Sequence, residues 1–196
     1  MKRDFIKVGS YLDNYMDLIN TSKKDYKTIF KIIKLLKNIK SKNKKVILVG
    51  NGGSAAIASH FSVDLTLNSK IKCINFNDAD LITCFANDFG YENWVSKAIN
   101  LYGDKGDALI AVSSSGRSKN IVNACKEGKK KKFSSIITFT GFEKNNPVRK
   151  NGKLNIWIDS KIYNYIENLH QILLLMIVDL INNKWMKSEI SYLLFI

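Results

Sequence analysis

Two pairs of ionisable side chains have a spacing that suits proton transfer. His60 and Asp64 are four residues apart, and Glu167 and His170 are three apart, so each pair would share one face of a helix. The chain has only two histidines, and both therefore have a carboxylate neighbour. Because imidazole gains and loses a proton near neutral pH, we interpret all four residues as candidate catalytic groups. His60, Asp64 and Glu167 are also candidate ligands for a metal such as zinc, with water completing the shell.

Two segments rich in glycine and serine offer a different chemistry. "GNGGS" covers residues 50–54 and "SSSGRS" covers residues 113–118, and each lies between an apolar segment and a helical pattern. Free N–H groups at a helix start, together with serine hydroxyls, can hold one phosphate monoester without a metal. Neither segment completes the GxxxxGK[ST] or GxGxxG pattern of nucleotide-binding loops. The sequence therefore predicts a phosphorylated small molecule as the ligand.

The elements that position these residues alternate between strands and helices. Two helical patterns open the chain, and helices are further predicted around 54–66, 79–101, 118–127 and 162–184. Short apolar runs predict strands at 45–50, 71–76, 108–113, 135–140 and 154–158. This alternation predicts a five-stranded parallel sheet in a three-layer α/β/α sandwich. Ligands bind such sheets beyond the carboxyl ends of the strands, where both glycine- and serine-rich segments fall.

Composition limits the alternatives. With 196 residues the chain is predicted to be one domain, with N-terminal helices over 1–43, an α/β core over 44–184 and a tail over 185–196. Its longest apolar stretch, residues 172–178, is too short to span a membrane, and no secretory signal is recognised at the N-terminus. Three cysteines without a CxxC pattern are typical of reduced thiols, which predicts a cytoplasmic protein. The net charge of +14 is scattered along the chain, which argues against a nucleic-acid partner.

The last predicted helix also indicates self-association. Residues 172–177 are all apolar, so a single sheet face cannot bury every side of this helix. We therefore expect a homotetramer, or at least a dimer. The apolar tail "YLLFI", residues 192–196, has no role assigned from the sequence.

Four strings in this order and spacing resemble the sugar isomerase (SIS) family: "GNGGSAAIASHF", "ANDFGY", "GDALIAVSSSGRSKNI" and "ITFTG". Within it the phosphoheptose isomerase group is the most similar. The resemblance implies a flavodoxin-like strand order and a homotetramer with sites between subunits. It implies an aldose–ketose isomerase of heptose, lipopolysaccharide or capsule biosynthesis, acting on a phosphorylated sugar such as sedoheptulose 7-phosphate. The substrate-binding residues that it implies are Asn51, Gly52, Gly53, Ser54, Asp88, Ser113, Ser114, Ser115 and Ser118, with the phosphate held by Ser113, Ser115 and Ser118.

The acid–base and metal positions differ from the family pattern. Members of the group usually have glutamate at position 64, glutamine at 167 and histidine at 175, where this chain has Asp64, Glu167 and Leu175. An arginine common after the first site helix is Asn68 here. The family histidine is both a zinc ligand and the second acid/base, so the zinc ligand set is incomplete. Because isomerisation through an enediol needs a base beside the carbonyl, we expect Glu167 to be that base.

Two other functions fit the same pattern. One is an SIS enzyme that acts on another sugar phosphate. The other is a non-catalytic phosphosugar-binding or adaptor protein, similar to the SIS protein that associates with the bacterial replication initiator. The first alternative keeps the chemistry and changes the sugar, whereas the second keeps only the binding.

Overall fold

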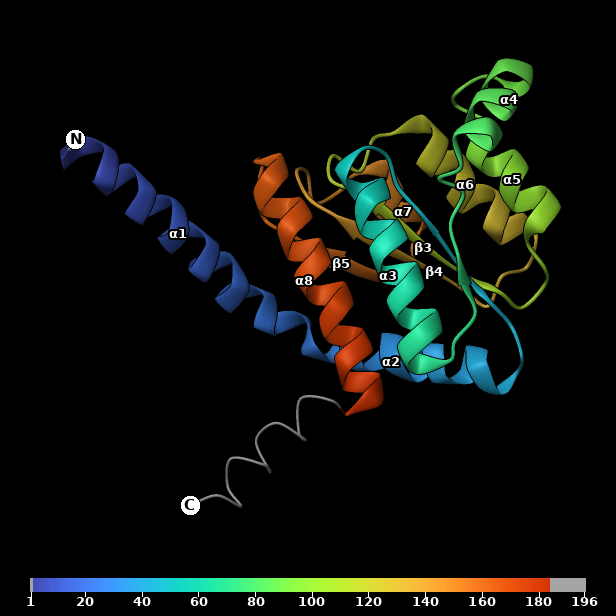
Figure 1. Ribbon diagram of the computed structural model, residues 1–196, viewed down its shortest axis with the longest axis horizontal. Coiled ribbons are helices and arrows are strands. Elements are labelled where there is room, and N and C mark those ends of the chain that lie inside the picture. The colour runs from blue at the N-terminus through green and yellow to red at the C-terminus, as the bar shows by residue number, and fades with distance from the viewer. Residues whose placement is uncertain (1, 184–196) are drawn as a thin grey trace.

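The structure, a computed structural model, describes residues 2–183 and forms a parallel sheet covered by helices on both faces (Figure 1). The described residues contain five strands in the order β2-β1-β3-β4-β5. Their bounds are β1 Val46–Val49, β2 Cys73–Ile74, β3 Ala108–Ser113, β4 Ser135–Thr140 and β5 Leu154–Trp157. All four strand pairings are parallel. The predicted α/β/α sandwich and its flavodoxin-like order are therefore confirmed.

The helices form two layers around this sheet. Their bounds are α1 Lys2–Ser22, α2 Tyr26–Ser41, α3 Gly53–Ser69, α4 Ala79–Phe89, α5 Trp94–Tyr102, α6 Lys119–Lys130, α7 Pro147–Asn151 and α8 Tyr163–Asn182, with a short 3-10 helix at Lys23–Asp25. Buried side chains of α2, α3 and α8 share one apolar core with one sheet face. Side chains of α5 and α6 form a second core on the other face. Burial on both faces explains why the central strands contain apolar or small hydroxyl residues and no charged ones.

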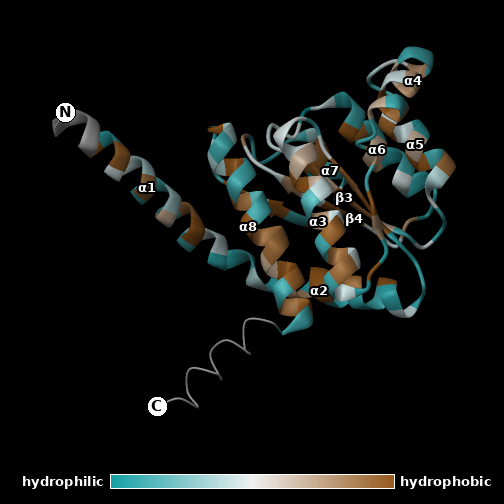
Figure 2. Ribbon diagram, viewed as in Figure 1, coloured by the Kyte–Doolittle hydropathy of each residue, from teal (hydrophilic) through white to brown (hydrophobic). Residues whose placement is uncertain are grey.

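Helix α1 stands apart from these layers. Figure 1 shows its N-terminal part extending away from the body of the molecule. Side chains of its middle reach the start of α8, where the Tyr165 hydroxyl donates to the main-chain oxygen of Tyr11 and Asn168 donates to the Tyr15 hydroxyl. Figure 2 shows apolar residues along the extended helix, and large apolar side chains on it are exposed, among them Ile6, Val8, Leu12 and Met16. Helix α1 therefore presents an apolar surface that the rest of the described residues leaves uncovered.

Two predicted elements differ in the structure. The helix predicted over 79–101 is divided into α4 and α5, because Gly90 takes a left-handed φ of 79° that ends α4. The strand predicted over 71–76 shrinks to the two residues of β2, which pairs only with β1 at the sheet edge. A short helix, α7, was not predicted; Pro147 begins it and the Asn146 side chain accepts from the Arg149 N–H at 2.8 Å.

The last helix of the described residues is α8. Helix α8 ends at Asn182, and the predicted tail, with residues 192–196, lies outside the described residues. No helix within residues 2–183 is long and apolar enough to cross a membrane. The division into residues 1–43, 44–184 and 185–196 stays a prediction.

Candidate functional site

The first glycine-rich segment opens the N-terminus of α3. It connects β1 to α3, and Gly52 has a φ of 55°, a conformation that side chains with a Cβ disfavour. Gly52 is also the N-cap, so no side chain satisfies the first N–H groups of α3. Ser54, in the first turn, is buried. The start of α3 is therefore an open set of N–H donors beside the sheet edge.

The serine-rich segment builds a second open helix start next to it. Ser118 is the N-cap of α6, yet its side chain makes no capping hydrogen bond among the described residues. Ser113 and Ser114 are each 5% exposed. Two main-chain bonds fasten the segment to the neighbouring β4–α7 connection: Gly141 N–H donates to Ser114 O at 2.9 Å, and Val148 N–H donates to Gly116 O at 2.9 Å. The loop is thus held in place from the side opposite to α3.

Strand pairing puts these two helix starts side by side. β1 pairs with β3, and Val49 at the end of β1 is level with Ala111. In the order 2-1-3-4-5 the chain turns to opposite sides of the sheet at β1 and β3, and ligands bind at this switch point. The two open N-termini and the serine hydroxyls together offer an anion site suited to a phosphate.

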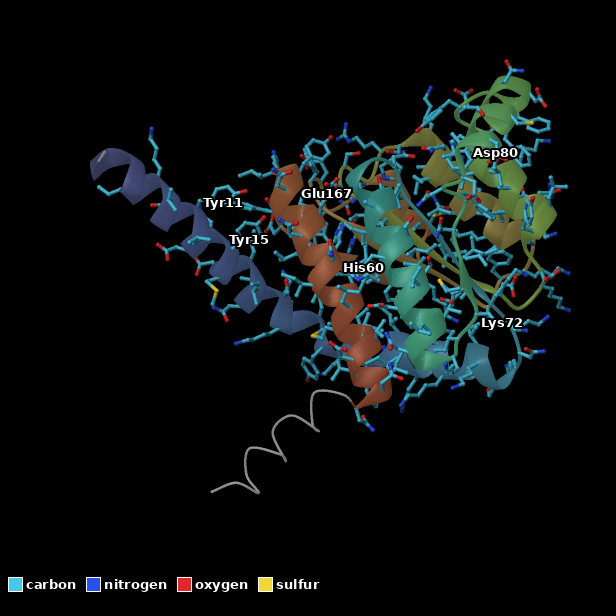
Figure 3. The ribbon with its side chains drawn as sticks, viewed as in Figure 1. Tyr11, Tyr15, His60, Lys72, Asp80 and Glu167 are labelled. Carbon is cyan, nitrogen blue, oxygen red and sulfur yellow. The ribbon has the colours of Figure 1, made fainter. Side chains whose placement is uncertain are left out.

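Glu167 joins the two segments. It lies near the start of α8, and its Oε1 accepts a hydrogen bond from the Ser114 hydroxyl at 3.2 Å. Its carboxyl group also lies directly over Gly53, so closely that a Cβ on Gly53 would collide with it. Figure 3 shows Glu167 at the end of α8 that lies next to the start of α3. The structure therefore brings together Gly53, Ser114 and Glu167, as the sequence analysis expected of site residues.

His60 and Asp64 lie further along α3. His60 Nε2 is 3.6 Å from Asp64 Oδ2, and the two side chains are 50% and 33% exposed. Gln171 on the neighbouring α8 approaches His60, with 3.4 Å between Gln171 Nε2 and His60 Nδ1. Seven residues separate His60 from Gly53, which is about 10 Å along a helix. The carboxylates of Asp64 and Glu167 therefore lie at different levels along α3, with Glu167 at its start and Asp64 further along.

The candidate metal ligands do not converge in a single chain. Within residues 2–183 no group of three or more His, Cys, Asp or Glu side chains is close enough to hold a metal ion. His60 and Asp64 approach each other, while Glu167 faces Gly53 and Ser114 instead. The residues of one chain thus do not fit a zinc site made by His60, Asp64 and Glu167.

His170 lies inside the protein rather than at the site. It is 0% exposed, its Nε2 is 3.3 Å from Thr140 O, and its ring meets Phe139 edge to face. Its Nδ1 has no hydrogen-bond partner among the described residues. Burial lowers the pKa of His170 to about 4, so the ring is neutral at pH 7. The expected pairing of His170 with Glu167 in proton transfer is corrected on this geometry: His170 packs α8 against β4 and faces no ligand.

Asp88 makes no described hydrogen bond to either loop. It lies exposed on α4, where its carboxylate accepts from the Asn87 side chain at 3.0 Å and from the Cys84 thiol at 3.8 Å, both on the same helix. No side chain of α4 is fully buried. The connection after α4 contributes instead Tyr91, whose hydroxyl donates to Asn51 Oδ1 at 3.4 Å.

Three side chains at the site were not singled out from the sequence. Gln171 follows Glu167 by one helical turn, which is the spacing that could have drawn attention to it. Asn120 lies two residues after Ser118, inside the string "GDALIAVSSSGRSKNI", and is hydrogen bonded to Asn51. Tyr91 reaches the site from a turn that the sequence pattern assigned to a continuous helix, although it is the last residue of the string "ANDFGY", which could have drawn attention to it.

Comparison with known proteins identifies the family. The sequence model of the SIS domain matches residues 10–141, and the chain belongs to this family. A phosphoheptose isomerase of Buchnera aphidicola is 38% identical over 143 residues, which is 70% of this chain and 72% of the relative. A phosphoheptose isomerase of Cytophaga hutchinsonii is 34% identical over 140 residues, 69% of this chain and 71% of the relative.

Solved structures agree in fold. A phosphoheptose isomerase from Neisseria gonorrhoeae has a TM-score of 0.84 at 23% identity, covering 90% of this chain and 97% of the other. One from Francisella tularensis also has a TM-score of 0.84, at 22% identity, covering 92% and 98%. The fold, including the helical N-terminus, is therefore that of the SIS domain proteins.

Proposed function

We propose that this protein is a phosphosugar aldose–ketose isomerase whose substrate is sedoheptulose 7-phosphate, and that it acts in heptose and surface-polysaccharide biosynthesis. Relatives named phosphoheptose isomerase share about a third or more of their residues with it over most of the chain. The observation that carries the proposal is the position of Glu167. Its carboxylate lies between Gly53 and Ser114, beside two open helix N-termini.

The phosphate is assigned to the serine-rich loop. Ser113, Ser115 and Ser118 lie at or beyond the end of β3, and the uncapped start of α6 directs its N–H groups to the same place. Charge-assisted hydrogen bonds from hydroxyls and amides would hold the dianion without a metal. The sugar is assigned to the neighbouring segment, with Asn51, Gly53 and Ser54 along it.

Glu167 is assigned the proton transfer. The carboxylate removes the proton from the carbon beside the carbonyl, and water gives a proton to the carbonyl oxygen, which yields an enediol. The protonated Glu167 then returns its proton to the neighbouring carbon while the hydroxyl on the first carbon gives its proton to water, so ketose and aldose interconvert without a redox partner. The Ser114 hydroxyl fixes one carboxylate oxygen at 3.2 Å and leaves the other free to act. The acid–base role of His60 and Asp64 stays a prediction, because the pair lies further along α3.

Self-association belongs to the same proposal. A pocket of about 1060 Å³ is lined by residues from the end of α1, from α2 and from α8, among them Phe30, Ile172, Leu173 and Met176. Together with the exposed apolar side chains of α1, this surface supports a homotetramer, or at least a dimer. Light scattering at micromolar concentration is expected to give a multiple of 22.3 kDa, and a particle of 22.3 kDa would exclude it.

One observation favours a second candidate, a phosphosugar-binding protein without catalysis. Leu175 stands where similar enzymes usually have a histidine that transfers protons, and a leucine cannot do so. Incubation of the purified protein with sedoheptulose 7-phosphate separates the candidates, with new anomeric signals followed by NMR. Conversion supports the isomerase. Binding without any new signal would support the binding protein, and conversion only of another sugar phosphate would identify a different SIS enzyme.

A further inference from the structure

Asn51 and Asn120 form a reciprocal pair of side-chain amides. Asn51 Nδ2 donates to Asn120 Oδ1 at 3.0 Å, and Asn120 Nδ2 donates to Asn51 Oδ1 at 2.8 Å. Asn51 belongs to the glycine-rich segment before α3, and Asn120 is the second residue of α6. The pair is therefore a direct side-chain link between the segment assigned to the sugar and the helix assigned to the phosphate.

The two amides differ in what they have left to offer. Asn120 is 2% exposed, and its Oδ1 and Nδ2 are both engaged by Asn51, so its amide is committed to this pair. Asn51 is partly exposed, and its Oδ1 also accepts from the Tyr91 hydroxyl at 3.4 Å. An amide nitrogen carries two N–H groups, and only one of those on Asn51 Nδ2 is used by Asn120. The other N–H remains available to an acceptor such as a sugar oxygen.

The reciprocal geometry fixes the orientation of Asn51. If the Asn51 amide alone turned over, its oxygen would face the Asn120 oxygen and its nitrogen would face the Asn120 nitrogen. Both hydrogen bonds would be lost, and the buried Asn120 amide would be left unsatisfied, which is unfavourable. A joint turn of both amides would restore the pair, but the Tyr91 hydroxyl would then no longer donate to Asn51 Oδ1. Asn120, together with Tyr91, therefore holds the free N–H of Asn51 in one direction before any ligand arrives, and preorganised groups bind without a further ordering cost.

We propose that Asn120 is a positioning residue for sugar binding: it touches no ligand, but it orients the Asn51 amide toward the sugar hydroxyls of the phosphosugar. The inference rests on the proposed function, since it takes Asn51 as a sugar contact. It adds a residue that recognises the sugar part of the substrate indirectly. Because the phosphate is assigned to other groups, Asn120 is expected to affect the sugar and leave the phosphate alone.

Calorimetry with two ligands tests this selectivity. Sedoheptulose 7-phosphate and inorganic phosphate are titrated into the wild type, Asn51→Ala, Asn120→Ala and the double variant. Each single change is expected to weaken binding of the sugar phosphate by about threefold to tenfold, the loss of one oriented hydrogen bond. The double variant is expected to bind no more weakly than Asn51→Ala, because Asn120 acts through Asn51. Inorganic phosphate is expected to bind all four proteins equally.

One further variant is a control, and another can replace Asn120→Ala if that variant does not fold. Asn123→Ala is the matched control, since Asn123 lies one turn further along α6 and donates to the main-chain oxygen of Glu92 at 2.9 Å; it should bind both ligands as the wild type does. Asn120→Asp keeps the size and the acceptor while losing the donor, so it tests the same orientation if Asn120→Ala does not fold. Its negative charge near the start of α6 is expected to weaken both ligands, so the orientation effect is the further loss for the sugar phosphate beyond that for inorganic phosphate.

The outcomes separate this inference from the proposed function. A wild type that binds inorganic phosphate but not sedoheptulose 7-phosphate would overturn the proposed substrate, and the inference with it. A wild type that binds the sugar phosphate, together with unchanged affinity in Asn120→Ala and Asn120→Asp, would overturn the positioning role alone. So would effects that multiply in the double variant, or an equal loss of inorganic phosphate binding, which would indicate a general disturbance of α6.

Discussion

Two regions of the molecule carry different kinds of polar group. One is the carboxyl-terminal edge of the sheet, at the ends of β1 and β3, and the other is the ridge where α3 and α8 lie side by side. At the edge, Ser113 and Ser114 are nearly inaccessible, and Glu167 is hydrogen bonded to the Ser114 hydroxyl. On the ridge, His60 is half exposed and its nearest polar contacts are 3.4 Å or longer. Buried, bonded groups keep one geometry, whereas exposed groups at long distances are weakly held. The difference indicates that one chain by itself holds the serine-rich loop and the Glu167 carboxylate in a fixed geometry, and holds His60 less tightly.

Removing the carboxylate at the edge is the strongest way to break this comparison. In Glu167→Gln the side chain keeps its size and can still contact Ser114, but it cannot take a proton. Turnover of sedoheptulose 7-phosphate is expected to fall by about 10²–10⁴-fold, the usual contribution of a general base. Steady-state assays of the wild type and the variant measure it.

A matched carboxylate shows whether the loss is specific. Glu143→Gln replaces a surface carboxylate that is 54% exposed and whose Oε1 lies 3.5 Å from Lys161 Nζ. Activity should stay unchanged in this variant. Glutamine is the residue that the resembling enzymes usually have at position 167. Full activity in Glu167→Gln would therefore refute Glu167 as the base and move the proton transfer to another group.

The phosphate loop gives the next largest effect. Replacing both Ser115 and Ser118 by alanine should weaken binding of the sugar phosphate by about 1–3 kcal/mol for each hydrogen bond lost. Titration calorimetry measures the affinity. Ser96→Ala is the control, because the Ser96 hydroxyl, on α5, donates to the main-chain oxygen of Asn93 and belongs to neither loop. Unchanged affinity in the double variant would place the phosphate elsewhere.

The fold was predictable because its signals are local. β3 and β4 were predicted with the bounds that they have, since each is an apolar run buried on both faces. β2 was predicted too long: Ile71 and Phe76 are buried like strand residues although they lie outside the ladder. The break at Gly90 was missed because a single glycine within an apolar helical pattern does not by itself end a helix.

The site was only half predictable, for a different reason. The positions of the two loops before α3 and α6 follow from the strand order alone, because the carboxyl ends of parallel strands lie at the same end of the sheet. Which face of α8 meets them does not follow from spacing. Glu167 and His170 are three residues apart, yet Glu167 faces Ser114 and His170 faces Thr140. The helical rotation between two residues, combined with the way α8 packs, separates a reactive carboxylate from a buried ring.

The buried ring predicts a pH effect on stability. Burial lowers the pKa of His170 to about 4, below the 6.5 of a free histidine, so the unfolded chain binds a proton that the folded one excludes. This contribution is complete above about pH 6.5 and is lost as the pH falls toward 4. Urea unfolding at pH 7 and pH 5 should show a smaller loss of unfolding free energy in His170→Asn than in the wild type. Equal losses would show that His170 is not buried as a neutral ring.

The exposed histidine supplies the smallest expected effect and the sharpest test of the ridge. If Glu167 carries out both proton transfers, His60→Gln should lower the turnover number by less than about tenfold, because a half-exposed group at 3.6 Å from Asp64 is weakly coupled to its surroundings. Asp64→Asn should have a similarly small effect. A loss in His60→Gln as large as that in Glu167→Gln would show instead that the reacting carbons lie on the ridge, about 10 Å along α3 from Gly53. In that case the serine-rich loop would still hold the phosphate, and the sugar would extend along α3 toward His60 and Asp64.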